Sequence, residues 1–241
     1  MLDYIIVIPA RYKSSRFPGK PLVIIKGKTL LERVWNQCSK AAPKNKIFVA
    51  TDNKKIYNYC IQKKYQCIMT STKCLTGTDR VYELSKQIKS KIYINVQGDE
   101  PLVLPKDIKK IIKYSLKYPK YILNGMCKIK NELDYRSFHV PKVVVNNDNF
   151  LLYMSRSGIP SNKKNEFVAS FKQVCIYAFP RKALATFSKM NKKTFFENIE
   201  DIEILRFLEL GYSVKMINVS ESSIGVDTPE DINRVSKYIK N

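Results

Sequence analysis

The sequence contains only one histidine and no closely spaced cysteines, which excludes several kinds of chemistry. A structural zinc site needs clustered cysteine and histidine ligands, so none is predicted. Catalysis by a nucleophile with a histidine base would have to use His139, and no obvious nucleophile stands beside it. We therefore interpret His139 as structural. The cysteines are expected to be reduced and mostly buried: Cys38, Cys60, Cys67, Cys74, Cys127 and Cys175.

Long apolar segments and the common nucleotide-binding motifs are missing as well. No window of about 18 residues is apolar, so no membrane insertion is expected. The first residues lack the basic start and cleavage site of a signal peptide, which favours a cytoplasmic location. Gly27-Lys28-Thr29 resembles the end of a P-loop, but Leu22 stands where its first glycine belongs, and Gly-x-Gly-x-x-Gly is absent. P-loop NTPases and conventional dinucleotide-binding proteins are thereby excluded.

Acidic residues are few relative to basic ones, and the formal net charge is +22. Such a charge raises the possibility of polyanion binding. The lysines, however, are spread along the chain in pairs, which is typical of solvated faces and of a lysine-rich genome. No helix-turn-helix, RNA-recognition or zinc-finger signature is present. An anionic small-molecule substrate is favoured, and no nucleic-acid partner is predicted.

The 241 residues, 44% of them hydrophobic, contain no repeat and no linker long enough to separate independent domains. Strands are predicted at 4–8, 46–50, 66–69 and 92–96, and they alternate with helices at 30–38, 54–63, 78–86 and 107–116. This order implies a parallel sheet with helices on both faces. Further strands are predicted at 121–128, 142–145, 150–154, 173–179 and 214–217, and further helices at 181–189, 199–210 and 229–239.

The polar segment Gln97-Gly98-Asp99-Glu100 directly follows a predicted buried strand. Ligands of parallel α/β sheets bind beyond the carboxyl ends of the strands, and a glycine lets backbone approach a ligand closely. An acidic pair there suits Mg²⁺, which takes one or two carboxylates and completes its shell with phosphates and water. A polar turn that caps the next helix is an equally open interpretation of this segment alone.

The loop after the first strand, residues 8–22, contains four cations and two serines. Backbone N–H groups and cationic side chains of such a loop can bind nucleotide phosphates. An exposed basic loop is the alternative, but Pro9, Pro18 and Pro21 stiffen the segment, which favours phosphate binding.

Two further segments each precede a predicted helix. In segment 76–80, Thr78 is expected to cap the helix and Arg80 to face the loop. In segment 225–231, Asp227 or Thr228 is expected as a cap ahead of Pro229. Capping is the commoner role for an aspartate at such a position. Metal binding by Asp227 is considered as an alternative only because Asp99 is also present.

Together, segments 8–22, 76–80, 95–101 and 225–231 resemble the CMP-3-deoxy-manno-octulosonate (CMP-Kdo) synthetases, also called 3-deoxy-manno-octulosonate cytidylyltransferases. The resemblance spans nearly the whole chain in the family's order. It implies one nucleotide-diphospho-sugar-transferase-like α/β domain, 1–241, with a mostly parallel sheet flanked by helices and a smaller dimerisation and sugar-binding region. Its parts would be a nucleotide-binding half at about 1–118, a sugar-acid and homodimerisation region at about 119–220, and a returning helix with a metal ligand at 221–241.

The resemblance also implies an activity: CTP and Kdo react, with Mg²⁺, to give CMP-Kdo and pyrophosphate for lipopolysaccharide or capsule synthesis. Catalytic residues would be Arg11, Lys20 and Asp99. The nucleotide would contact Ala10, Arg11, Lys20, Thr78 and Arg80. Magnesium would bind Asp99 and Asp227, and the sugar acid would bind Gln97, Arg156 and Tyr177. Attack of an anomeric hydroxyl on an α-phosphoryl group needs alignment and charge neutralisation more than a strong base, so no catalytic histidine is required.

Some positions depart from the family pattern. Gln173 stands where a histidine is usual, Ile204 where a glutamine is usual, Ala178-Phe179 where small residues including a glycine are usual, and Asp79 where glutamate is common. We expect positions 173 and 204 to face the sugar, so another substrate, such as 8-amino-Kdo or another ulosonic acid, is an alternative. A binding protein without catalysis and a basic nucleic-acid-binding module are alternatives of other classes.

Overall fold

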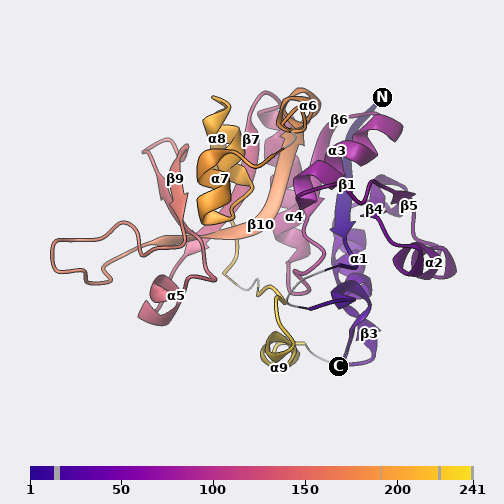
Figure 1. The fold of residues 1–241 in the computed structure, drawn as a ribbon, viewed down its shortest axis with the longest axis horizontal. Helices are drawn as coiled ribbons and strands as arrows, with labels where there is room; N and C mark the ends of the chain where they lie inside the picture. Colours follow the sequence, from indigo (N-terminus) through magenta and orange to yellow (C-terminus); the bar gives the residue numbers. More distant parts are fainter. Residues whose placement is uncertain (14–16, 191, 222–223, 240–241) are drawn as a thin grey trace.

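A mixed sheet forms the centre of the computed structural model, which describes residues 1–13, 17–190, 192–221 and 224–239 (Figure 1). Its strands lie in the order β11-β7-β10-β6-β1-β4-β5, and β8 and β9 continue from one end of β10. The strands are β1 Leu2–Ala10, β4 Ile47–Thr51, β5 Cys67–Met69, β6 Ser90–Val96, β7 Ile122–Lys128, β8 Lys142–Val145, β9 Leu151–Ser155, β10 Phe171–Pro180 and β11 Val214–Asn218. A separate small hairpin pairs β2 Ile24–Ile25 with β3 Lys28–Thr29.

Both faces of this sheet are covered by helices, as the sequence predicted. Alternate residues of β1 point to opposite faces of the sheet. Ile6 and Ile8 belong to one hydrophobic cluster, and Ile5 and Val7 belong to the other. The first cluster is covered by α1 Leu30–Ala41, α2 Lys54–Gln62 and α4 Pro105–Lys117. The second is covered by α3 Gly77–Gln87, α6 Arg181–Phe187 and α8 Ile204–Glu209. The predicted α/β fold class is confirmed.

Strand β10 is the one reversed strand in the main path of this sheet. It lies between β6 and β7 and is antiparallel to both, whereas β1 pairs with β4 and β6 in parallel, and β7 with β11 in parallel. Figure 1 shows β10 crossing the centre of the molecule, from β8 and β9 towards α6. The second half of the chain is thereby joined directly to the first through the sheet.

The predicted helix at 199–210 is wrong, because two short helices occupy this region. Helix α7, Phe195–Glu200, ends at Asp201, whose φ of 50° lies in the left-handed region, and α8 begins at Ile204. Aspartate tolerates this conformation better than most residues do. Apolar residues on both sides of the break keep a helical spacing, so periodicity alone did not reveal it. Helix α5, Glu132–Arg136, is only one turn long and was not predicted.

The end of the described chain returns to the beginning of the protein. Helix α9, Glu230–Ser236, packs with the β2 region in a small cluster of Ile25, Leu30, Val226 and Val235. Lys26 Nζ also donates to the carbonyl of Ile239 at 2.9 Å. Figure 1 shows α9 on the same side of the molecule as β3. This return places the segment that carries Asp227 next to the loop after β1. No helix among the described residues is long and apolar enough to cross a membrane.

Candidate active site

A cavity of about 420 Å³ opens where β1 and β6 end. All the predicted site residues except Thr78 line it, and they come from six segments of the sequence. The cavity is lined by Ala10, Arg11, Lys20, Arg80, Gln97, Asp99, Arg156, Tyr177 and Asp227, together with residues that were not predicted. Ser14, Ser15 and Arg16 of the predicted phosphate-binding loop lie outside the described residues.

Lys20 connects the two carboxylates that were predicted as metal ligands. Its ammonium donates to Asp99 Oδ2 at 2.8 Å and to the carbonyl of Val226 at 2.7 Å, and it lies 3.4 Å from Asp227 Oδ1. The Lys20 side chain is only 13% exposed. The Lys20 ammonium therefore offsets the repulsion between two neighbouring carboxylates.

The carboxylate of Asp227 does not cap α9. The backbone amides of Asp227 and Thr228 instead donate to Asp231 Oδ2 at 2.9 and 3.0 Å. Asp231, in the first turn of α9, thereby holds the two residues that precede the helix, and among the described residues no side chain caps α9 at Pro229. The expected cap at Asp227 or Thr228 is therefore not formed, and the Asp227 carboxylate lies beside Lys20 at the cavity instead.

Asp99 and Asp227 fit the donor set of a magnesium ion. Both are hard oxygen ligands beside a cavity with room for phosphates. Among the described residues no group of three or more histidine, cysteine, aspartate or glutamate side chains could hold a metal. Two carboxylates suit Mg²⁺ better than zinc, because Mg²⁺ usually keeps several water or phosphate ligands.

Gly98 allows the loops after β1 and β6 to meet closely. A β-carbon at this position would lie 2.6 Å from the carbonyl oxygen of Pro9, which is closer than real β-carbons approach. The carbonyl of Asp99 accepts from the amide of Val226 at 2.9 Å. The loop that carries Asp99 is thus fixed against the β1 loop on one side and the Asp227 segment on the other.

The start of α3 differs from the prediction, because Thr76 and not Thr78 caps the helix. Thr76 Oγ1 accepts from the Asp79 amide at 3.2 Å, and Asp79 Oδ2 accepts from the Thr76 amide at 2.9 Å, which forms a capping box. Thr78 is 1% exposed, and it does not line the cavity. Arg80 does line it, but its guanidinium is also paired with Asp52 Oδ2 at 2.9 Å.

Glu203 is a cavity residue that the sequence prediction missed. Its carboxylate accepts from the Gly77 amide at 3.0 Å, the Thr78 amide at 3.0 Å and the Thr78 hydroxyl at 2.6 Å. Burial raises the pKa of Glu203 despite these donors, which favour the charged form. Glu203 therefore places a carboxylate directly on the N-terminus of α3, beside the cavity.

Arg156 and Tyr177 are two of the cavity residues contributed by the second half of the chain. The Arg156 guanidinium donates to the carbonyls of Phe138 at 2.8 Å and Asp201 at 3.0 Å. Tyr177 is 5% exposed, and burial raises its pKa well above the ordinary value. His139, which we had interpreted as structural, is exposed on the cavity wall.

Lys142 is a fully buried cation behind this wall. Its ammonium donates to the carbonyls of Ser137 and Val140, each at 2.8 Å, and also to the carbonyl of Arg156. Burial lowers the pKa of Lys142 to about 8. The lysine thereby joins the segment around His139 to the strand end that carries Arg156.

Comparison with known proteins identifies the chain. A family model described as cytidylyltransferase matches residues 5–217. The 3-deoxy-manno-octulosonate cytidylyltransferase of Trichlorobacter lovleyi is 37% identical, over 99% of both chains. The protein of that name from Fusobacterium nucleatum is 38% identical, over 99% of this chain and 98% of the relative. The chain belongs to the 3-deoxy-manno-octulosonate cytidylyltransferase family.

Solved structures agree with this assignment. The structure of a CMP:2-keto-3-deoxy-manno-octonic acid synthetase complexed with CTP superimposes with a TM-score of 0.90 at 33% identity, over 98% of this chain and 97% of the other. The predicted family, fold and enzyme class, a nucleotidyltransferase, are therefore confirmed.

In this cytidylyltransferase, Ile204 does not face the sugar as expected. It is 1% exposed and packs in the hydrophobic cluster under α8, whereas the preceding Glu203 lines the cavity. Successive residues at the start of α8 point in different directions, so Glu203 faces the cavity while Ile204 turns into the cluster. The apolar side chain at 204 suits its buried position. Gln173, the other departure, does line the cavity.

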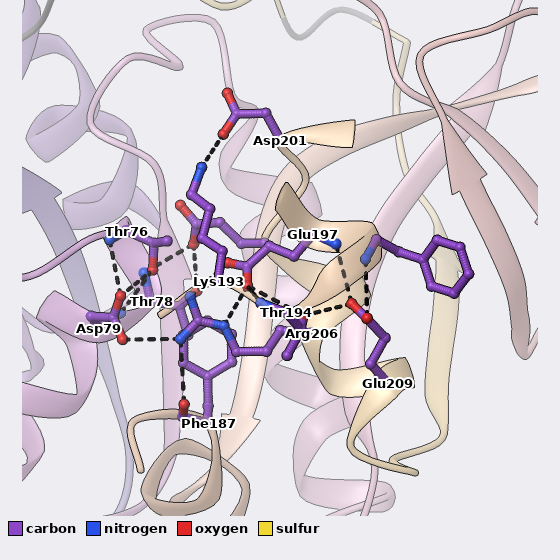
Figure 2. Close-up of polar contacts among 12 residues, drawn as sticks. Thr76, Thr78, Asp79, Phe187, Lys193, Thr194, Glu197, Asp201, Arg206 and Glu209 are labelled. Atoms are coloured by element: carbon purple, nitrogen blue, oxygen red, sulfur yellow. Dashed lines mark hydrogen bonds and ion pairs between the residues drawn. The ribbon is translucent and has the colours of Figure 1, made fainter. Parts of the chain in front are cut away.

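The position of α8 in the cytidylyltransferase is fixed by a buried ion pair (Figure 2). Arg206 is fully buried and donates to both oxygens of Glu197, at 2.6 and 2.7 Å. It also lies 3.4 Å from Asp79 Oδ1, and its guanidinium stacks 3.7 Å from the centre of the Phe187 ring. This network joins α3, α6, α7 and α8, so it holds Glu203 against the start of α3.

Proposed function

We propose that this cytidylyltransferase transfers CMP from CTP to the anomeric hydroxyl of Kdo and releases pyrophosphate, in the supply of activated Kdo for lipopolysaccharide or capsule synthesis. The observation that carries the proposal is the convergence of Lys20, Asp99 and Asp227 in one cavity with Arg11. It is supported by full-length relatives that bear the Kdo name and by a similar structure that was solved with CTP.

The carboxylates of Asp99 and Asp227 would hold Mg²⁺. When bound, this ion would supply charge neutralisation of the triphosphate and acidify the attacking hydroxyl. Arg11 and Lys20 would bind phosphate oxygens and stabilise the pyrophosphate as it leaves. Lys20 reaches both carboxylates, so it is well placed to exchange these partners for phosphate oxygens when CTP enters.

Other residues would act by shape and orientation. Ala10, Thr78 and Arg80 would surround the cytidine, although Thr78 and Arg80 are hydrogen-bonded to Glu203 and Asp52. These two residues would therefore shape the nucleotide site through the packing of α3. Gln97, Arg156 and Tyr177 would bind the sugar acid, with Arg156 supplying charge for its carboxylate.

Activation of a different sugar acid, such as 8-amino-Kdo or another ulosonic acid, is the second candidate. The specific observation that favours it is Gln173, which lies on the cavity wall where the family pattern has a histidine. A site built around hydrogen bonds rejects strongly an analogue that lacks them.

The protein is further proposed to work as a homodimer in the cytoplasm. Large apolar side chains are exposed on β9 and α7: Leu152, Phe195, Phe196 and Ile199. A second copy would cover them. Light scattering of the protein and of Phe195→Glu, with exposed Leu133→Glu as the matched control, tests this proposal. Loss of the dimer only in Phe195→Glu supports it, and a monomeric wild-type protein contradicts it.

The experiment that tests the activity is pyrophosphate release from CTP and Mg²⁺ with Kdo, its 8-amino analogue and neuraminic acid. Release with Kdo is the expected result. Release only with another acid would keep the nucleotide site and replace the sugar. The absence of release with every acceptor would contradict the proposed transfer.

A further inference from the structure

Strand β10 has a β-bulge beside the cavity. The pairing of β10 with β7 changes register between Val174 and Tyr177. Asn124 of β7 lies opposite this irregularity and is fully buried. Its Nδ2 donates to the carbonyls of Val174 and Ile176, each at 3.0 Å. The amide thereby satisfies two backbone acceptors that the irregular pairing exposes.

These bonds fix the orientation of the Asn124 amide. Both partners are carbonyl oxygens, which only accept, so the nitrogen of Asn124 must face them. Its Oδ1 then faces Gln173 and accepts from Gln173 Nε2 at 2.9 Å. An amide oxygen cannot donate, so the nitrogen of Gln173 in turn must face Asn124.

The bond to Asn124 fixes which amide atom of Gln173 is left for the cavity. The residue lines the cavity, and its backbone amide is also held by the carbonyl of Pro141 at 3.0 Å. Within the described part of the chain, Gln173 Oε1 has no hydrogen-bond partner. One Nε2 hydrogen is bonded to Asn124, and Oε1 is left as an acceptor for a ligand in the cavity.

We propose that Gln173 Oε1 selects a sugar acid that carries a hydrogen-bond donor opposite it, either a hydroxyl or an ammonium group, and that Asn124 is the residue that positions this acceptor. The inference rests on the proposed function and refines its substrate. A histidine at this position could donate or accept, depending on its tautomer, whereas the oxygen of a glutamine held in this orientation only accepts. An ammonium group forms the stronger, charge-assisted bond, so an amino sugar is a favoured substrate of this site.

The kinetic test uses Kdo and a set of derivatives in which one hydroxyl at a time is replaced by fluorine or by an amine. In the wild-type enzyme, we expect fluorine at one position to lower kcat/KM at least about tenfold, while an amine at the same position is accepted. In Gln173→Leu, both substitutions at that position should change kcat/KM less than about twofold, with the KM for CTP unchanged. Gln66→Leu, far from the cavity, is the matched control. Equal penalties in wild type and Gln173→Leu would overturn the proposal.

A second measurement does not depend on turnover. The side-chain amide of Gln173 is identified in a ¹⁵N spectrum of the free protein by its loss in Gln173→Leu. We expect the hydrogen that is bonded to Asn124 Oδ1 to exchange slowly and to stay protected when Kdo is added, because the oxygen of Gln173 meets the sugar. Rapid exchange of both hydrogens would overturn the assigned orientation. Protected hydrogens in a protein that turns over no sugar acid would instead contradict the proposed function.

Discussion

Lys20 Nζ lies 2.8 Å from Asp99 Oδ2 and 3.4 Å from Asp227 Oδ1, so one ammonium group lies at the proposed magnesium ligands. A lysine and a metal ion cannot both occupy this position, because their charges repel. Binding of Mg²⁺ and CTP as proposed would therefore require Lys20 to exchange carboxylates for phosphates.

Asp99→Asn should lower kcat by about 10²- to 10³-fold, because a charged ligand is replaced by a neutral one at the reacting phosphate. Steady-state pyrophosphate release measures the effect, and an unchanged melting temperature shows that the variant is folded. Asp3→Asn removes another exposed carboxylate that pairs with a lysine, Lys91, and serves as the control. Near-normal turnover in Asp99→Asn would show that Asp99 is not the metal ligand.

Lys20→Met should weaken the use of CTP and strengthen the binding of Mg²⁺. The KM for CTP should rise at least tenfold, because a phosphate contact is lost, whereas Mg²⁺ should bind the free enzyme more tightly, because no ammonium competes for the carboxylates. Calorimetric titration with Mg²⁺ and kinetics with CTP test both parts. Lys28→Met controls for the loss of one positive charge. Weaker Mg²⁺ binding in Lys20→Met would contradict the exchange.

Gly98→Ala should damage the site through the backbone. Its β-carbon would lie 2.6 Å from Pro9 O, so the loops after β1 and β6 must separate. Overpacking of this kind costs about 1–3 kcal/mol of unfolding free energy, and kcat/KM should fall at least about tenfold. Gly225→Ala is the matched control, because its β-carbon would approach no atom closer than 3.6 Å. Urea denaturation measures the unfolding free energy, and steady-state kinetics measure kcat/KM. Equal values in the two variants would refute the packing argument.

Glu203 should make stability depend on pH in an unusual direction. Burial raises the pKa of Glu203 above its ordinary value of 4.5. The folded state then holds the proton more tightly than the unfolded state, so the contribution of Glu203 to stability falls as pH rises from 4.5 through the raised pKa. The difference in unfolding free energy between wild type and Glu203→Gln should therefore shrink across this range in urea titrations.

Glu209 supplies a control of opposite sign. Although burial opposes the effect, hydrogen bonds from Thr194 and from backbone amides at the start of α7 lower the pKa of Glu209. The contribution of Glu209 is present above its ordinary pKa and is lost as pH falls through the lowered one. The advantage of wild type over Glu209→Gln should therefore grow with pH. Parallel curves for the two variants would contradict the assigned directions.

Arg206→Met should destabilise the protein by about 3–5 kcal/mol, because Glu197 would be left as a buried, unpaired carboxylate at 1% exposure. Equilibrium denaturation measures the loss. The double variant Glu197→Leu/Arg206→Met should recover part of it, because no buried charge remains. A double variant no more stable than Arg206→Met would show that the pair does more than balance charge.

The sequence predicted most of the first half of the fold because strands and helices there alternate with clear periodicity. The meeting of Asp99 and Asp227 in one cavity was also within reach, since Asp99 follows a buried strand and Asp227 stands in a segment that matches the family. Thr76-x-x-Asp79 is the spacing of a capping box, so the true cap of α3 was visible in the sequence, although Thr78 was preferred.

What the sequence could not supply depends on contacts between distant segments. Glu203 meets the start of α3 only because Arg206 joins α8 to α3, α6 and α7, and no local pattern encodes that meeting. The break at Asp201 is one residue in the left-handed region and leaves the apolar spacing unchanged. His139 reaches the cavity wall through the segment held by Lys142.

The reversed strand β10 has a consequence for how the chain folds. Strand β6 is complete at residue 96, but its neighbour on one side is β10, which ends at Pro180. During synthesis, more than half of the chain that follows β6 must be made before β10 can cover this edge. The first half therefore emerges with an exposed edge and unburied apolar residues such as Ile94 and Val96. We expect a fragment of residues 1–118 to aggregate, and folding to be slow and limited by the arrival of β10.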